Sequence, residues 1–200
     1  MDEYQKQVVG LQAAQVIEAL RRNNMDGYFV ERAADVPEQV ARLLHDGDTV
    51  AVGGSKTLTQ TGVLDLLRSG RYRFIDRYAP DIPDMRNVFL DSFAVDAYLS
   101  SVNAVTLNGE LYNVDGNSNR VAAICYGPRS VILVAGVNKI VKDIDAAVTR
   151  VKRCAAPANA ARLGCDTYCA KTGACMGLGE TWRPAAKPVP VSAAPTWYPP

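Results

Sequence analysis

The sequence predicts an α/β protein built on a Rossmann-like, mostly parallel sheet with flanking helices. Strand-like apolar segments alternate with helical patterns along most of the chain, which is typical of parallel sheets covered by helices. One of these strands runs directly into two glycines, Gly53-Gly54, and a helical pattern follows them. The stretch 130–135 is almost continuously apolar, as expected for a strand whose two faces are both covered.

The first half of the chain alternates helix and strand signals. Apolar residues at helical spacing predict an amphipathic helix over residues 4–23. A short apolar run predicts a strand over 27–30, and a second helix is expected over 35–45. Residues 49–52 predict the strand that precedes the two glycines, and we expect one helix over 58–68 after them.

The second half continues this alternation and adds one hairpin. Asn108-Gly109 stands between two strand-like runs, which is the strongest short-range signal for a hairpin and indicates one antiparallel strand. The elements that we expect here are a loop with a short helix over 71–93, a strand-like stretch over 94–107, a return strand over 111–114, a helix over 119–126, a strand over 130–135 and a helix over 143–153.

The length suits one α/β domain with an appendage, since the chain has 200 residues. We assign residues 1–163 to the α/β domain and 164–180 to a C-terminal segment that contains cysteines. Residues 181–200 form a tail rich in proline and alanine. The tail has no packing pattern, so we expect it to be mobile or to lie along the surface.

The composition argues against two classes of partner. There are 22 lysines and arginines against 21 aspartates and glutamates, so the chain lacks the basic excess of a nucleic-acid-binding protein. No apolar run approaches the length that spans a membrane. The first residues are polar and lack the apolar core of a signal peptide, so we expect a cytoplasmic protein.

The segment after the strand at 49–52 is a candidate anion-binding loop. Its residues are Gly53, Gly54, Ser55, Lys56 and Thr57. Glycines let a ligand approach the backbone closely, and the N–H groups at the start of the next helix favour an anion. The segment is not a nucleotide P-loop, because Val50 and Ser55 stand where that motif requires glycines. The alternative is a plain tight turn followed by a capped helix.

Two further loops follow predicted strands and carry polar groups. The candidate ligand-binding residues in them are Asp115, Gly116, Asn119 and Arg120 in the first loop and Gly136, Asn138 and Lys139 in the second. Loops that follow parallel strands meet at the carboxyl edge of a sheet, so we expect the three loops to form one pocket. Arg120 is suited to bidentate binding of a carboxylate or phosphate. The alternative for the first loop is a structural turn in which Asn119 caps the helix and Arg120 pairs with Asp115.

Four of the five cysteines fall late in the chain, at Cys154, Cys165, Cys169 and Cys175. Four thiolates are enough to hold zinc or an iron–sulfur cluster. The sequence contains no C-x-x-C pair, which is the commonest element of such sites. Reduced thiols in a segment folded onto the domain are therefore the alternative.

Four segments together resemble the stand-alone LUD-domain proteins, the lactate-utilization protein family. They are residues 52–58 (VGGSKTL), 72–78 (YRFIDRY), 113–123 (NVDGNSNRVAA) and 134–140 (VAGVNKI). The resemblance runs from about residue 4 to about residue 175 and includes residues 169–175 (CAKTGAC). It implies a fold similar to that of the NagB, ribose-5-phosphate isomerase (RpiA) and CoA-transferase group, in which the first Gly-rich loop holds a sugar phosphate or a CoA-derived group.

The resemblance also implies a function. We expect a protein of bacterial carboxylate (lactate) utilization that binds a small anionic or phosphorylated ligand at the Gly-Gly loop. Its partners would be subunits of a lactate-oxidising complex or a second copy of the chain. One alternative is a non-enzymatic assembly or regulatory subunit that docks on an iron–sulfur oxidoreductase. Another is an isomerase or an acyl or CoA transferase of the wider fold group. The sequence names no reaction and no catalytic residue, and it leaves open whether the protein is an enzyme.

Overall fold

The computed structural model describes residues 2–176 as parts of two compact units, each of which is described by itself. The first, called the sheet unit, consists of Val30–Val102 and Asp115–Gly136. The second, called the hairpin unit, consists of the described parts of Met1–Phe29, Asn103–Val114 and Val137–Pro200. The predicted boundaries at residues 163 and 180 stay a prediction, and the Pro/Ala-rich tail lies outside the described residues.

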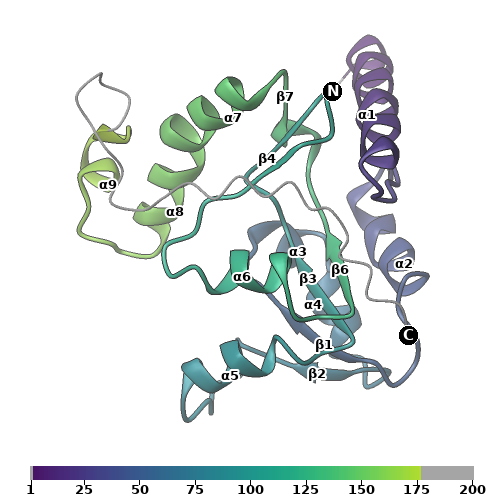
Figure 1. Cartoon of the computed structure of the whole chain (residues 1–200), viewed down its shortest axis with the longest axis vertical. Coiled ribbons are helices and arrows are strands. Elements are labelled where there is room, and N and C mark those ends of the chain that lie inside the picture. Colours follow the sequence, from purple (N-terminus) through teal and green to yellow (C-terminus); the bar gives the residue numbers. More distant parts are fainter. Residues whose placement is uncertain (1, 177–200) are drawn as a thin grey trace. The chain divides into compact units, whose positions relative to one another are not determined.

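The sheet unit is built on four parallel strands (Figure 1). Their order across the sheet is β2 (Arg73–Ile75), β1 (Thr49–Val52), β3 (Ala97–Ser100) and β6 (Ser130–Leu133). All neighbours in this sheet run in the same direction, so the carboxyl ends of all four strands lie at one edge. The predicted α/β class with a Rossmann-like parallel sheet is therefore confirmed.

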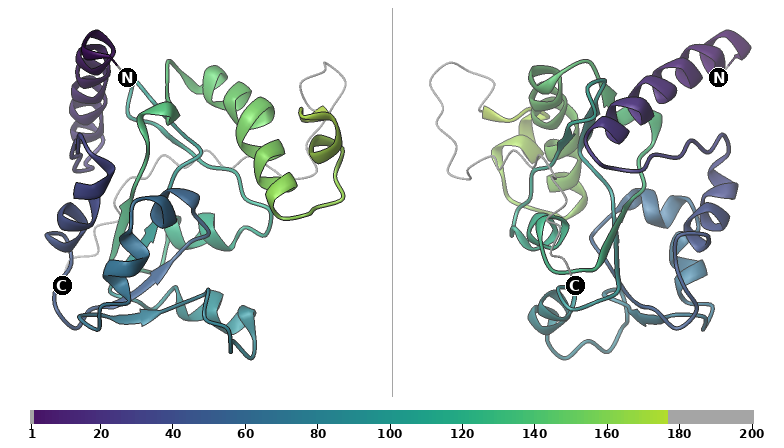
Figure 2. Two further views of the ribbon diagram at one scale, coloured as in Figure 1. Left: turned by 180° about the vertical axis from the view of Figure 1, so that it is seen from behind. Right: turned by 45° about the vertical axis from the view of Figure 1, so that its right-hand side comes forward.

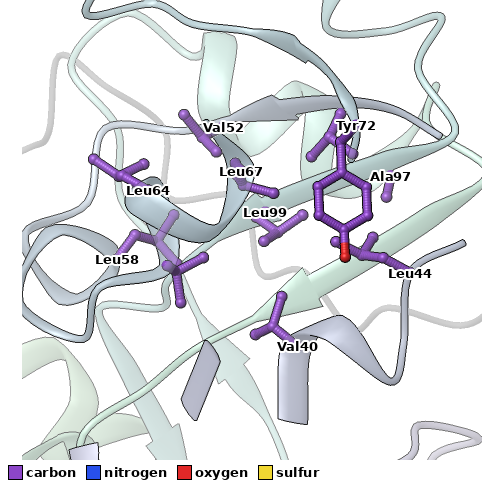
Figure 3. Packing of buried hydrophobic residues seen from close by; sticks show 11 residues of the cluster. Val40, Leu44, Val52, Leu58, Leu64, Leu67, Tyr72, Ala97 and Leu99 are labelled. Atoms are coloured by element: carbon purple, nitrogen blue, oxygen red, sulfur yellow. The ribbon is translucent and has the colours of Figure 1, made fainter. Parts of the chain in front are cut away.

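One face of this sheet is covered by three short helices. They are α2 (Val36–Ala41), α3 (Lys56–Gln60) and α4 (Val63–Leu67). Side chains on all three pack against the sheet residues Val50, Val52 and Leu99, which are almost fully buried (Figure 3). These sheet residues alternate along their strands, as a period of two requires when one face of a strand meets a helix layer.

The intervening strand residues face α6 (Asn119–Cys125), which lies on the other side of the sheet. Ala51 and Tyr98 form a second buried cluster with Ala123 and Ile124 of α6. Helix α5 (Met85–Asp91) lies between β2 and β3 in the chain, and the side chain of Asp84 caps its start. The two clusters show that the central strands β1 and β3 are covered on both faces by helices.

Four details of the sheet unit and of the residues that lead into it differ from the sequence-based expectations. Residues 27–30 form no strand. Helix α2 ends at Ala41, before the expected end at residue 45. The single helix expected over 58–68 is divided into α3 and α4, because Gly62 adopts a φ of +75° that interrupts the helix. Strand β6 is an edge strand whose first two residues are exposed, whereas Ile132 and Leu133 are half-buried against the core clusters on opposite faces of the sheet, so the apolar run at 130–135 is covered on both faces only in its later part.

The hairpin unit contains a smaller sheet and the remaining helices (Figure 2). Its strands are β5 (Leu111–Tyr112), β4 (Ala104–Thr106) and β7 (Ile140–Val141), with β4 and β5 antiparallel and β4 and β7 parallel. Its helical segments are α1 (Glu3–Arg22), the 3-10 turn η2 (Val137–Lys139), α7 (Ile144–Arg150), the π-helical turn η3 (Val151–Ala155), α8 (Ala156–Arg162) and α9 (Tyr168–Thr172). The predicted hairpin at Asn108-Gly109 is therefore present.

The turn of this hairpin packs against the end of α1 within the hairpin unit. The side-chain amide of Asn23 donates to the backbone oxygens of Asn108 (3.2 Å) and Gly109 (3.4 Å). The buried hydroxyl of Thr106 accepts the N–H groups of Asn108 and Glu110 and donates to the Glu110 carboxylate. The hairpin turn is thus held by Asn23 of the neighbouring helix end and by Thr106 of its own strand.

In residues 2–176, no helix is both long and apolar enough to cross a membrane.

Candidate functional site

The candidate site lies at the carboxyl edge of the parallel sheet, on the face covered by α6. Ala51 and Tyr98 point to this face, so alternation along β1 and β3 carries Gly53 and Ser100 to the same face. Gly53 continues the pairing of β1 with β3, because its N–H donates to the oxygen of Leu99 at 2.8 Å. Ligands of open α/β sheets bind at this edge.

Gly53 is in close contact with three side chains of this unit. A Cβ placed on Gly53 would lie 2.6 Å from Ser100 Oγ, 2.8 Å from the Tyr98 hydroxyl and 2.9 Å from Arg120 Cγ. Real Cβ atoms do not approach other atoms so closely, so only glycine fits this position. The sequence predicted that this glycine lets a ligand approach the backbone. In the structure it lets the side chains of Tyr98, Ser100 and Arg120 approach the backbone of residue 53.

Gly54 has different surroundings, because it is exposed. Its nearest neighbour at the Cβ position is the guanidinium group of Arg77, with Nη1 at 3.7 Å and Nη2 at 3.9 Å. Arg77 follows β2, the neighbour of β1, and so belongs to the same edge of the sheet. Of the two glycines, Gly54 is therefore the one whose backbone is open to a ligand.

The loop at 115–120 is held by a carboxylate. Asp115 Oδ2 accepts the backbone N–H groups of Arg120 at 2.8 Å and of Val121 at 3.0 Å, which satisfies two donors at the start of α6. The residue that precedes α6 is Ser118, with a left-handed φ of +63°. Of the predicted residues in this loop, Gly116 is exposed and Asn119 is half-buried. The alternative interpretation of this loop expected Asn119 to cap the helix. In the structure Asp115 does so instead.

Arg120 links α6 to the end of β3. Its Nη1 donates to the backbone oxygen of Ser101 at 2.8 Å, and its stem lies against Gly53. Burial lowers the pKa of this guanidinium, and the Asp115 carboxylate opposes that change. The group remains a cation at neutral pH, since the ordinary pKa of arginine lies far above neutral.

Tyr98 brings a buried phenol to the site. Its side chain is 2% exposed. Burial raises the pKa of its hydroxyl to about 12, although the guanidinium groups of Arg77 and Arg120 act in the opposite direction. The phenol is therefore protonated at neutral pH and is a hydrogen-bond donor near two cations.

The remaining residues of the first loop have mostly structural contacts. Ser55 is the N-cap of α3, where its hydroxyl accepts the N–H of Leu58 at 3.3 Å. Lys56 is exposed, and Thr57 is half-buried. The loop therefore contains the capped helix of the alternative interpretation, and it also contains the exposed Gly54 that an anion site requires.

The third predicted loop is divided between the two units. Gly136 is the last residue of the sheet unit, whereas Asn138 and Lys139 belong to the 3-10 turn η2 of the hairpin unit. There the backbone oxygen of Asn138 accepts Nε of Arg150 at 3.1 Å. A role for Asn138 and Lys139 in the pocket stays a prediction.

The four late cysteines are all free thiols in the hairpin unit. Cys154 and Cys165 are exposed, and Cys169 and Cys175 are half-buried. Within residues 2–176, no group of three or more histidine, cysteine, aspartate or glutamate side chains is arranged to hold a metal ion. A metal role for these cysteines stays a prediction.

Three residues of the site were missed by the sequence analysis, namely Arg77, Tyr98 and Ser100. Tyr98 and Ser100 lie in a run that reads as core strand, and both are indeed buried. Arg77 follows β2, a strand that was not predicted, since residues 71–93 were expected to form a loop with a short helix. The residues 72–78 were among the segments that resemble a known family.

Comparison with known families identifies a related domain family. A family model of the LUD domain matches residues 13–182, which is most of the chain. No curated protein matches the chain.

Proposed function

The chain belongs to the LUD-domain family, and on this premise we propose that it binds a small anion of carboxylate metabolism at the carboxyl edge of β2, β1 and β3. The family is named for lactate utilization. A role in that process, with lactate or a related short carboxylate as ligand, is the function that we propose for this chain.

One observation carries the proposal, namely the packing of Tyr98, Ser100 and Arg120 around Gly53. The hydroxyl of a phenol is costly to bury unless it has a hydrogen-bond partner, and Tyr98 is only 2% exposed. A negatively charged ligand would provide such a partner. The exposed backbone of Gly54 leaves room for one beside this cluster.

The local charges favour an anion. The guanidinium groups of Arg77 and Arg120 both act on the Tyr98 hydroxyl, and Asp115 is the one carboxylate that acts on it with them. A carboxylate or a phosphate group would balance the positive charge of these guanidinium groups.

Titration of the purified protein with lactate, pyruvate, acetate and inorganic phosphate tests the proposal. A ligand at 100 times its Kd stabilises the folded state by about 2.7 kcal/mol, so thermal unfolding should shift to higher temperature. We expect Tyr98→Phe to weaken carboxylate binding, since it removes a donor. Tyr126→Phe is the matched control, because it removes a hydroxyl that is exposed next to α6. If no anion changes the unfolding temperature, the proposed site does not exist.

A second candidate function uses the cysteines. Cys154 and Cys165 are exposed thiols and are therefore accessible to a partner protein. In this case the protein would be an assembly or regulatory subunit of an iron–sulfur oxidoreductase. Anaerobic purification followed by iron and zinc analysis separates the two functions. Stoichiometric metal that is lost in Cys169→Ser would favour the subunit, and its absence would favour the anion-binding protein.

A further inference from the structure

The turn after β2 holds Arg77 in a fixed place. Asp76 Oδ1 accepts the backbone N–H of Tyr78 at 2.9 Å, and its backbone oxygen accepts the N–H of Ala79 at 3.1 Å. The other carboxylate oxygen, Oδ2, accepts Nε of Arg68 at 2.8 Å. Because Asp76 is used by the turn and by Arg68, the acidic residue next to Arg77 is not its partner.

Aromatic rings support the Arg77 side chain. Its guanidinium carbon lies 5.0 Å from the ring centre of Phe89 in α5 and 5.7 Å from that of Tyr78. Such cation–π contacts stabilise a guanidinium group and leave its N–H edge free to donate. No ion pair joins Arg77 to an acidic side chain in residues 2–176. Arg77 is thus a half-buried cation that lacks a countercharge within the described structure.

Arg120 differs from Arg77 in this respect. Its Nη1 donates to the backbone oxygen of Ser101, and its backbone N–H donates to Asp115. Its stem fills the space that the missing side chain of Gly53 leaves. Through these contacts Arg120 holds α6 against the ends of β1 and β3.

We propose that Arg77 binds the charged group of the ligand and that Arg120 is a positioning residue. This inference rests on the proposed anion site, which it deepens by assigning its charge-binding group. The ligand group would be an oxyanion that presents two oxygens to the two Nη atoms beside Gly54, as carboxylates and phosphates do. The Tyr98 hydroxyl, which is 2% exposed and makes no hydrogen bond to another residue of 2–176, would donate to the same ligand.

Isothermal titration with lactate and with inorganic phosphate tests this assignment. Removing a charged hydrogen-bond partner costs about 1.5–3 kcal/mol, so Arg77→Met should weaken binding by about 10-fold to 150-fold. Arg86→Met is the matched control, because it removes an equal charge from the exposed surface of α5 and should bind like wild type. Both variants should unfold at the temperature of the unliganded wild type. The lactate and phosphate titrations show which oxyanion the site prefers.

Two further variants separate the roles of the arginines. Phe89→Leu keeps the Arg77 charge but removes a ring that holds it, so binding should weaken by a smaller factor than in Arg77→Met. Arg120→Met should lower the unfolding temperature of the unliganded protein, as expected for a residue that holds α6. If Arg77→Met binds like wild type while Arg120→Met abolishes binding at unchanged stability, Arg77 is not the charge-binding residue and the anion site itself stands. If wild type binds neither probe, both proposals fail.

Discussion

The hydroxyl oxygen of Tyr98 lies 2.8 Å from the point where a Cβ on Gly53 would stand. The strand end of β1 and the buried phenol of β3 therefore fit together only while residue 53 has no side chain. This contact couples the stability of the sheet edge to the geometry of the candidate site, because the same glycine also faces Ser100 and Arg120.

Gly53→Ala should therefore destabilise the protein and weaken anion binding. The added methyl group would overlap three side chains, and overpacking of this kind costs about 1–3 kcal/mol. Gly54→Ala is the matched control for stability, since its nearest neighbour would be Arg77 at 3.7 Å, an ordinary contact. Urea unfolding of both variants checks this prediction. Equal stability of the two would mean that Tyr98, Ser100 and Arg120 move aside without cost.

Gly109→Ala should be more destabilising than a change at an open glycine. Gly109 has a φ of +80°, and a Cβ there would lie 2.8 Å from the carbonyl carbon of Ala19 and 2.9 Å from the nitrogen of Leu20 in α1. Gly173→Ala is the control in the same unit, because Gly173 has a φ of +77° and no atom of residues 2–176 lies within 4 Å of its Cβ position. The left-handed backbone alone costs about 1–2 kcal/mol in each variant.

The difference between these two variants measures how tightly the hairpin turn packs on α1. We expect an additional cost of about 1–3 kcal/mol in Gly109→Ala, since backbone atoms of α1 cannot rotate away as a side chain can. Chemical unfolding, with α-helix content followed by circular dichroism, gives both values. Equal costs would contradict the packing of the turn against α1.

The fold was predictable because its signals are local. Periodic apolar residues identified the helix α1 and the strand β1, and Asn108-Gly109 identified the hairpin. Two expectations were wrong for different reasons. Residues 27–30 are apolar but pair with no strand, and Gly62 divides one expected helix into two.

The candidate site was predictable only in part, because its chemistry depends on contacts between distant residues. The sequence indicated a special role for Gly53 but not the reason for it, since Tyr98 and Ser100 lie far along the chain. No motif in the sequence marks Arg77 as a site residue. It lies beside Gly54 because β2 pairs with β1. Asp115 was identified, but its role as acceptor of two N–H groups of α6 required the structure.

Tyr72→Phe should leave stability unchanged or raise it. The Tyr72 hydroxyl is buried and has no hydrogen-bond partner among residues 2–176, and its ring lies among apolar side chains of the larger core (Figure 3). An unsatisfied buried polar group costs about 1–3 kcal/mol, so removing it should recover up to that amount. Tyr126→Phe, at an exposed position, should have no effect. Loss of stability in Tyr72→Phe would show that the hydroxyl has a partner in solution.

The stability of the sheet unit should decrease in acid partly through Asp96. The backbone N–H of Thr49 donates to Asp96 Oδ2 at 2.9 Å, and Arg129 and Arg73 lie within ion-pair distance of the same carboxylate. The Thr49 hydrogen bond is the main cause that holds the pKa of Asp96 below its ordinary value, and the two arginines add to it.

Because the pKa of Asp96 is lower in the folded state, the free energy of unfolding should fall as the pH falls. The carboxylate stabilises the fold above the unfolded-state pKa of about 3.9, and this contribution is lost as the pH falls through the lower folded-state pKa. Asp96→Asn should therefore be less stable than wild type at pH 7, and the difference should shrink as the pH falls below 4. Urea unfolding of both proteins between pH 7 and pH 2.5 checks this. A difference that stays constant over this range would mean that the ionised form of Asp96 does not contribute to stability.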